Sequence, residues 1–514
     1  MQITFLGQAG LFIETKGNSI LCDPWFNPAY FASWFPFPSN EGIDPGRIGN
    51  PTYLYISHLH HDHYDPAFLA QHVSKEATII LPDYPLDHLE RELRGLGFTS
   101  FLRTENNVPV TVGGLKFMVT ALVAPTDGPI GDSALCIDDG DVRVLNQNDS
   151  RPIDLEPLLA QGPFDALFLQ FSGAIWYPMV YDFPQKMTAA LGRKKRTDGM
   201  ARAYRYIEML APRVVVPSAG PPCFLDDDLF HFNDFDRDSA NTFPDQTVFL
   251  EYIAERGVFD GRLMMPGSVG ELLPDSFTVR HPLPDDEVQA IFTDKRTYLR
   301  DYQARKWPVI QQEHTRWPRG QVDVLSELQQ WFEPLLEQAD MICAGINDAV
   351  LLDLTDMGVL IDFRTRKVTQ WQGEDWAYRF RIDRGIVEQC ILHHHEDWVN
   401  ELFLSCRFEA SRRGKYNDYI YTFFKCLSEE RLQYAEGFYA ENGPSQGTWE
   451  AAGYRIQKRC PHMKADLTRF AVIEDGVLTC RLHNWQFELA TGRCLTANDH
   501  TLYARPIEQE AKNE

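Results

Sequence analysis

The sequence lacks three features that would place it in common classes of protein. No apolar run approaches the roughly 20 residues that a membrane-spanning helix needs, so no membrane association is expected. Basic residues are few, with 49 Lys and Arg against 73 Asp and Glu and a formal charge of −24, whereas a nucleic-acid partner would need a basic face. The stretch MQITFLGQAGLFIE at the N-terminus has neither a basic n-region nor a cleavage site, so we expect a cytoplasmic protein without a signal peptide.

Spacings typical of a disulfide framework are also missing. Most of the cysteines stand singly in apolar or mixed segments, which is typical of reduced thiols in a protein core. Two of them differ, because Cys460 and Cys480 are each followed within three residues by a histidine.

The 514 residues are too many for a single core, and their patterns divide into three parts. Residues 1–272 alternate short apolar strands with helices, which predicts an α/β domain whose strand ends carry the functional residues. Residues 273–448 combine long helical patterns with the strands of AVLLDLTDMGVLIDF, which predicts a helix-rich α+β middle domain. Residues 449–514 are short strands separated by turn residues, which predicts a small all-β domain.

The segment ISHLHHDHYD places metal-binding side chains directly after a buried strand. Alternate residues of an extended segment point the same way, so His58 and His60 can bind one metal ion. Asp62 and His63 follow where the chain turns into a helix, and they can bind a second ion. Imidazole and carboxylate ligands together suit zinc or non-haem iron. A polar loop that is rich in histidine by chance is the alternative for this segment.

This spacing and the order of strands around it resemble the metallo-β-lactamase superfamily, which implies an αββα sandwich. The resemblance implies that Asp149, at the end of VRVLNQND, supplies a carboxylate to the metals. It also implies that Asp23 of CDPWF holds a ligand imidazole in one tautomer. Two histidines of the hydrolytic members are absent here. The segment VAPTDGPIGDS offers Asp127 or Asp132 in place of one of them, and VVVPSAGPPCF lacks the other.

The donors that remain are His58, His60 and a carboxylate, either Asp149 or Asp127. Two histidines and one carboxylate with open positions form the ligand set of non-haem Fe(II) oxygenases. We therefore predict His58, His60 and Asp149 as the catalytic set, with one or two iron ions. His231 of LFHFND could fill a further position, but a role outside the ligand set is favoured for it.

A second group of donors lies near the C-terminus. Cys460 and His462 form C-x-H, and Cys480 and His483 form C-x-x-H after 17 intervening residues. Zinc sites more often pair like ligands within one turn, so a zinc site is the weaker alternative. Two thiolates for one iron and two imidazoles for the other are what a Rieske [2Fe–2S] cluster needs. The segment CRLHNWQFELATGRC resembles the second cluster-binding loop of Rieske domains.

The two kinds of domain together resemble the CMP-N-acetylneuraminate hydroxylase family, with the Rieske domain at the C-terminus here instead of the N-terminus. The resemblance implies an oxygenase that hydroxylates a small polar substrate with O₂, and it suggests a nucleotide-sugar or a sialic-acid-like compound as that substrate. It also implies an external electron donor, which is a reductase, a ferredoxin or a cytochrome. Two other classes stay open: a metal-dependent hydrolase or lactonase with an accessory Rieske domain, and a non-enzymatic redox sensor.

Two further segments draw attention. The aromatic run WFNPAYFASWFPF at residues 25–37 either lines a substrate pocket or packs in the core. The run His393, His394, His395 and Glu396 suggests a metal site, but consecutive residues cannot all face one point. We predict that these histidines are structural or lie on the surface.

Overall fold

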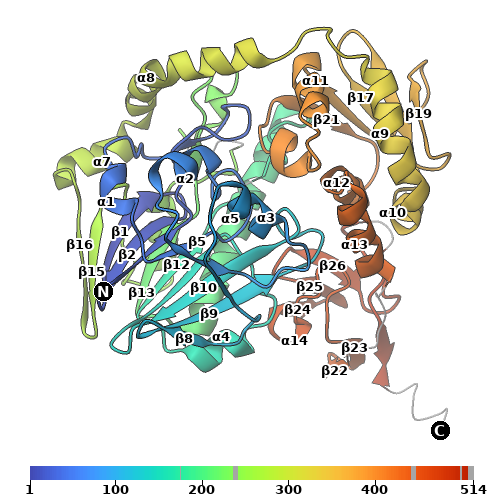
Figure 1. Ribbon diagram of the computed structural model, residues 1–514. Coiled ribbons are helices and arrows are strands. Elements are labelled where there is room, and N and C mark those ends of the chain that lie inside the picture. The colour runs from blue at the N-terminus through green and yellow to red at the C-terminus, as the bar shows by residue number, and fades with distance from the viewer. Residues whose placement is uncertain (174, 236–240, 441–446, 498–499, 508–514) are drawn as a thin grey trace. The chain divides into compact units, whose positions relative to one another are not determined.

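The computed structural model describes residues 1–173, 175–235, 241–440, 447–497 and 500–507 (Figure 1). These residues form two compact units. Unit 1 comprises residues 1–123, 127–316 and 400–407, and unit 2 comprises residues 124–126, 317–399 and 408–514, as far as each is described. Unit 1 therefore takes a short segment, 400–407, from a part of the chain that otherwise belongs to unit 2. In the described residues, every helix is too short or too polar to cross a bilayer.

Unit 1 is built on two large sheets. The first has eight strands in the order β16-β15-β1-β2-β3-β5-β6-β7, and the second has six in the order β13-β12-β11-β10-β9-β8. The strands of the first sheet are β1 (Gln2–Gly7), β2 (Gly10–Thr15), β3 (Asn18–Cys22), β5 (Tyr53–Tyr55), β6 (Thr78–Leu81), β7 (Phe101–Arg103), β15 (Val269–Leu273) and β16 (Ser276–Arg280). Those of the second are β8 (Val110–Val112), β9 (Leu115–Leu122), β10 (Asp132–Asp138), β11 (Arg143–Asn148), β12 (Ala166–Gln170) and β13 (Val214–Ser218).

The two sheets pack face to face. One apolar cluster lies between them and takes side chains such as Phe5 and Ile20 from the first sheet and Phe117 and Val216 from the second. A second cluster lies on the outer face of the first sheet, where Phe68 and its neighbours from the helices cover the strands. Helices on the outside of two stacked sheets give the αββα arrangement that the sequence predicts.

The helices of unit 1 follow the strands in chain order. They are α1 (Pro45–Ile48), α2 (Pro66–His72), α3 (His88–Gly95), α4 (Glu156–Gln161), α5 (Gln185–Leu210), α6 (Gln246–Ala254), α7 (Asp285–Thr293) and α8 (Lys295–Arg316), with the short helix η1 (Phe230–Phe232). A small ladder pairs β4 (Phe35–Pro36) with β14 (Pro222–Cys223). Asp65 caps the start of helix α2, because its carboxylate accepts a hydrogen bond from the Phe68 amide. Pro66 lies in the first turn of this helix, which is a common position for proline.

Strand direction decides where a site can form in unit 1. Strands β3, β5, β6 and β7 run parallel, and so do β11, β12 and β13. Parallel strands end at the same edge of their sheet, so the segments that follow β5, β11, β12 and β13 are brought to common edges. The histidine segment follows β5, and Asp149 follows β11.

Unit 2 contains a five-stranded sheet in the order β19-β18-β17-β20-β21, flanked by helices. Its strands are β17 (Ala349–Asp353), β18 (Gly358–Asp362), β19 (Lys367–Gln370), β20 (Tyr378–Ile382) and β21 (Phe408–Arg412). Its helices are α9 (Val324–Gln338), α10 (Asp340–Ile346), α11 (Arg384–Leu392), α12 (Asp418–Lys425) and α13 (Glu429–Ala440), and the π-helical turn η2 (Val399–Phe403) leads into the segment of unit 1. This is the helix-rich α+β architecture expected for the middle of the chain.

The C-terminal part of unit 2 consists of two three-stranded sheets, β22-β23-β27 and β24-β25-β26. The strands are β22 (Thr448–Ala451), β23 (Tyr454–Gln457), β24 (Ala471–Glu474), β25 (Val477–Cys480), β26 (Trp485–Glu488) and β27 (Ala504–Pro506), with a single helical turn, α14 (Leu467–Phe470). Cys480 ends β25 and Trp485 begins β26, and the two are directly paired across this hairpin. The second Cys-His pair therefore lies in the turn of a β-hairpin.

Candidate metal and cluster sites

The histidine segment of unit 1 is buried at the end of β5. His58 and His63 are 1% and 0% exposed, and Asp62 is 3% exposed. Because the buried apolar strand ends at Tyr55 and α2 starts at Pro66, the intervening loop directs its polar side chains inward at the strand edge. Buried titratable side chains in such number need partners or a bound ion.

One ring nitrogen of His58 faces one ring nitrogen of His60, and the second nitrogen of each ring contacts a polar side chain. Nε2 of His58 lies 2.7 Å from Nδ1 of His60. The outer nitrogens contact Ser57 Oγ, 2.9 Å from His58 Nδ1, and Asn400 Oδ1, 2.7 Å from His60 Nε2. Burial lowers the pKa of both rings, so both are neutral at pH 7. An amide oxygen only accepts, so His60 donates through Nε2 and its lone pair is on Nδ1.

In this arrangement the lone pairs of His58 Nε2 and His60 Nδ1 are close enough for one metal ion to bind both. An outer hydrogen bond that fixes the tautomer and ring orientation is the usual accompaniment of a metal-binding histidine. His58, His60 and Asp149 each offer a ligand atom, and these atoms lie within 4.8 Å of one another. Among the residues that the structure describes, this is the group of three or more such donors that could hold a metal ion.

Carboxylates surround the pair. Asp132 Oδ1 is 3.3 Å and Asp149 Oδ1 is 3.9 Å from His58 Nδ1. Both oxygen atoms are buried, and neither has a hydrogen-bond partner within the described part of the chain. Burial and the neighbouring charge of Asp149 raise the pKa of Asp132 well above its usual range. Asp127 is buried nearby, and its charge also raises the pKa of Asp132.

His63 forms a second group of donors with Asp62 and Asp149. Its Nδ1 lies 3.1 Å from Asp23 Oδ2, while its Nε2 lies 3.7 Å from Asp62 Oδ2 and 3.6 Å from Asp149 Oδ2. Burial alone would lower the pKa of His63, but the carboxylates of Asp149, Asp62 and Asp23 raise it to about 10. A metal ion at Nε2 would take the place of the proton that this pKa implies.

The donor chemistry fits a bound metal. Nε2 of His63, Oδ1 of Asp132 and Oδ1 of Asp149 are buried atoms without a hydrogen-bond partner in the residues described, and buried polar atoms are rarely left so. Asp23 contacts His63 and also accepts hydrogen bonds from the amide and hydroxyl of Ser57, and its role in fixing a ligand imidazole stays a prediction. The choice of ligands among His58, His60, Asp62, His63, Asp127 and Asp149 stays a prediction.

Three partners of this site were not found from the sequence. Asn400 comes from the segment 400–407 and also donates to the carbonyl oxygen of Gly128 at 3.1 Å. Gln8 Nε2 and the Tyr30 hydroxyl each donate to Asp62 at 2.7 Å. Both are buried, and the phenol and amide orient the carboxylate of Asp62. Gln8 and Asn400 stand in no motif that a sequence pattern would single out, and Tyr30 is one of several aromatic residues in the run at 25–37.

The aromatic run at residues 25–37 packs mainly in the core. Trp25, Trp34, Phe35 and Phe37 are each 1% exposed. Tyr30 is 2% exposed and reaches Asp62, so it is a structural neighbour of the donors. This favours the core-packing alternative for most of the run.

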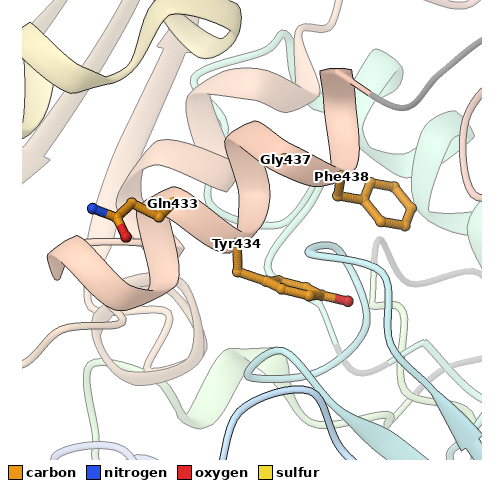
Figure 2. A pocket seen from close by; sticks show the side chains of 4 residues that line it. All are labelled: Gln433, Tyr434, Gly437 and Phe438. Carbon is orange, nitrogen blue, oxygen red and sulfur yellow. The ribbon is translucent and has the colours of Figure 1, made fainter.

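The other histidine candidates are not members of the metal-binding group. His231 is exposed, and its ring lies 4.1 Å from that of Phe232. His394 follows the end of α11 and stacks on Trp331 at 4.2 Å. A hollow on α13 of unit 2 is lined by Gln433, Tyr434, Gly437 and Phe438 (Figure 2), and these side chains include none that commonly binds a metal.

Replacing His393, His394 and His395 together by Ala is expected to leave the metal content of the protein unchanged. The ring centres of His393 and His395 lie 6.0 Å apart, but the ring of His394 stacks on Trp331, so the run does not bring three donors to one point. Elemental analysis of the purified variant beside the parent protein checks this. Loss of one metal ion per chain, with an unchanged circular dichroism spectrum, would show that these residues form a real site.

The two Cys-His loops of unit 2 have matching backbones. The amide of Lys464 donates to the carbonyl of Cys460 at 2.9 Å, and the amide of Asn484 donates to that of Cys480 at 2.7 Å. In both loops the residue four positions after the cysteine has a positive φ, 59° at Lys464 and 59° at Asn484. Each loop therefore folds back on its cysteine in the same way.

These loops bring together the thiols and imidazoles. Cys460 and Cys480 are 1% and 0% exposed, and the ring centres of His462 and His483 are 5.1 Å apart. Burial raises the pKa of the Cys460 thiol, while a hydrogen bond from Cys460 lowers that of Cys480. Backbone amides also donate to both sulfurs, which stabilises thiolates and tunes the potential of an iron–sulfur cluster. The donor set fits a [2Fe–2S] cluster.

Comparison with known proteins finds a family match for three parts of the chain. Residues 2–176 match the beta-lactamase superfamily domain, and residues 446–503 match the Rieske [2Fe-2S] domain. Residues 324–441 match the Rv3818-like, SCP2-like domain. The protein thus combines a metallo-β-lactamase-fold domain with a C-terminal Rieske domain, which confirms the expected fold class and the [2Fe–2S] cofactor.

The chain is 47% identical over 511 residues to the mycobacterial protein Rv3818 of Mycobacterium tuberculosis, described as a Rieske 2Fe-2S iron-sulfur protein, across 98% of this chain and 99% of that one. It belongs to the Rv3818-like family of Rieske proteins. It is also 25% identical over 246 residues to cytidine monophosphate-N-acetylneuraminic acid hydroxylase of Pan troglodytes, covering 43% of this chain and 38% of that protein. The structure of CmlA, a diiron β-hydroxylase from Streptomyces venezuelae, overlaps 55% of this chain and 54% of its own at 16% identity, with a TM-score of 0.34.

Proposed function

We propose that this protein is an oxygenase, in which electrons that enter at the [2Fe–2S] cluster support hydroxylation of a small polar substrate at a non-haem iron. The observation that carries the proposal is the presence in one chain of a Rieske domain and of the His58–His60–Asp149 donor group, in which His58 is buried and the other two residues are partly buried. A cluster whose irons are fully ligated can only pass electrons, so it needs a second centre at which a substrate reacts.

The residues of unit 1 would hold and orient the iron. His58, His60 and Asp149 would bind it, with Asp62 and His63 either binding a second iron or orienting the first set. When bound to two histidines and a carboxylate, iron retains open positions and supplies the activation of O₂. Ser57 and Asn400 fix the two ring tautomers, Asp23 fixes that of His63, and Gln8 and Tyr30 hold Asp62. His58, Asp62 and His63 are buried, which limits the access of water to these three side chains.

Cys460, His462, Cys480 and His483 would hold the cluster. Hydroxylation places one oxygen atom of O₂ in a C–H bond of the substrate and releases the other as water, which consumes two electrons and two protons. The cluster carries one electron at a time, so an external reductase, ferredoxin or cytochrome must reduce it twice in each turnover. The substrate class follows the related hydroxylase, whose name specifies a nucleotide-linked sialic acid.

The second candidate is a metal-dependent hydrolase or lactonase with an accessory Rieske domain. The hydrolase is favoured by the presence of donors for a second metal ion, since Asp62, His63 and Asp132 surround Asp149. The absence of the two further histidines of hydrolytic relatives argues against it, since the carboxylate-rich set that remains suits iron as well as zinc.

Metal analysis and electron paramagnetic resonance of the dithionite-reduced protein test the proposal. We expect a brown protein with more iron per chain than the two atoms of one cluster, and a reduced signal of low average g-value, as imidazole ligation of a [2Fe–2S] centre produces. A protein that contains only zinc at the unit 1 site and cleaves esters or lactones without a reductant would replace the oxygenase by the hydrolase.

A further inference from the structure

Three cationic side chains gather at one edge of the second sheet in unit 1. Arg151 lies in the loop after β11, and Lys195 and Arg202 lie on α5. Burial lowers the pKa of Lys195 to about 8 and that of Arg202 to about 9, and in both cases the next cause is the positive charge of Arg151. Lys195 and Arg202 thus share a site with a third cation, although the chain as a whole carries a formal charge of −24. Like charges held together in a protein are costly unless an anion offsets them.

Helix α5 is built to place these charges against the sheet edge. Gly199 lies against the segment after β12, and a β-carbon there would come within 3.1 Å of the carbonyl oxygen of Phe171. Lys195 precedes Gly199 by four residues and Arg202 follows it by three, so all three share one helix face. A β-carbon on Gly173 would lie 3.8 Å from Cε of Lys195, which places the lysine chain over the end of β12.

Among the described residues, no carboxylate forms an ion pair with Arg151, Lys195 or Arg202. Arg151 donates to the neutral amide oxygen of Gln170 at 3.4 Å, and its Nε is buried without a hydrogen-bond partner in the described residues. Nη2 of Arg202 is buried and equally lacks a partner there. Asp198 is the acid whose charge acts on both α5 cations, but it is bound by Lys194 at 2.7 Å.

Arg196, in the same helix, is a buried cation that is paired with a carboxylate. Arg196 is 4% exposed and forms two hydrogen bonds to the carboxylate of Asp234, at 2.7 and 3.2 Å. A bidentate pair of this kind neutralises the charge of a buried guanidinium and satisfies two of its donors. Arg151, Lys195 and Arg202 have no such carboxylate in the part of the chain that is described. A negatively charged ligand would offset their charge.

We propose that Arg151, Lys195 and Arg202 form a subsite that binds an oxyanion, either a phosphate or a carboxylate group of the substrate. The subsite lies beside the metal-binding side chains, because Arg151 follows Asp149 by two residues in the same loop. This inference rests on the proposed function for the identity of the ligand as the substrate, and it assigns that substrate to the anionic class. Guanidinium groups recognise phosphate and carboxylate by paired hydrogen bonds, and lysine adds a point charge.

Isothermal titration of the full-length protein with inorganic phosphate and, separately, with acetate tests the subsite. We expect one saturable site per chain for at least one of the two anions, and the anion that binds more tightly identifies the group recognised. Lys195→Gln and Arg202→Gln should each weaken that binding by about tenfold or more, because each removes a charge-assisted contact.

Arg193→Gln is the matched control, since it removes the same charge from the same helix but on the exposed, opposite side of Gly199. It should bind the anion as the parent protein does. His58→Ala should also retain anion binding, which excludes attachment of the anion to a metal. Lys195 is partly exposed, so its variant is available even if Arg202→Gln fails to fold.

Absence of saturable binding, or equal binding by the parent and the Lys195→Gln protein, overturns the subsite. The iron content of the same samples separates this result from failure of the proposed function. A zinc protein that binds phosphate through Lys195 would support the subsite and contradict the oxygenase. An iron protein with no anion site would support the oxygenase and contradict the subsite.

Discussion

Cys480→Ser is expected to yield a protein that has lost its brown colour and cannot turn over with its natural electron donor. The substitution replaces a soft thiolate by a hydroxyl, which is a poor ligand for an iron–sulfur cluster. Cys480 is fully buried in the turn between β25 and β26, so no other thiol can move into its place without unfolding the hairpin. We expect iron to fall by about two atoms per chain, the number in one [2Fe–2S] cluster, and the iron of unit 1 to remain.

Cys494→Ser is the matched control for this experiment. Cys494 lies in the same sequence segment, is 3% exposed, and accepts a hydrogen bond from the amide of Ala497 at 3.4 Å. A serine oxygen can also accept that bond, so the cluster and its visible spectrum should persist. If Cys480→Ser were as active as the parent protein in the steady state, the cluster could not be the source of electrons.

Local patterns were sufficient to predict most of the strands of unit 1. The segment PTYLYISH is a nearly continuous apolar or aromatic run, and VRVLNQND begins with Val142, Val144 and Leu145; they form the buried strands β5 and β11, whose two faces are covered. The donors at the ends of these strands could be named for the same reason, since Asp149 and the histidine segment each come directly after a strand. The Cys-His loops were predictable because both donors of each loop lie within four residues.

Contacts between distant segments could not be predicted in this way. Asn400 is 340 residues from His60, and its role depends on the chain leaving unit 2 to return to unit 1 at 400–407. Gln8 and Tyr30 reach Asp62 only because β1 and the loop after β3 are assembled beside β5. The single amides of Gln8 and Asn400 have no spacing pattern, and Tyr30 is one of several aromatic residues in its run, so the sequence does not show that any of them contacts the donor residues.

The sequence also could not predict which carboxylate of the segment VAPTDGPIGDS approaches the histidines. Asp127 and Asp132 stand in one segment, and the sequence gives no reason to prefer either. In the structure Asp132 begins β10 and approaches His58 to 3.3 Å, because the strand pairing carries it to the sheet edge. The cationic face of α5 was also missed, since Lys195 and Arg202 form a pair only when Gly199 brings the helix against β12.

His58→Ala is expected to leave the cluster intact and to abolish formation of the hydroxylated product. The change removes one of two neutral nitrogen donors from the predicted iron site, and its Nε2 is the atom that faces His60 at 2.7 Å. Loss of an outer partner typically weakens metal binding by about 10–100-fold, so loss of a direct ligand should weaken it further. The cluster has its own four donors in unit 2, and its visible and paramagnetic signals should be unchanged.

His61→Ala provides the control within the same loop. His61 turns away from the group to Glu401, with Nε2 and Oε1 2.7 Å apart, and it is not among the predicted ligands. Its variant should retain the iron of unit 1 and form product. The decisive measurement combines elemental iron, the visible spectrum and product formation with reductant on the three proteins side by side. If His58→Ala kept its full iron content and its activity, the iron would have to be bound elsewhere, and the site at the end of β5 would lose its catalytic role.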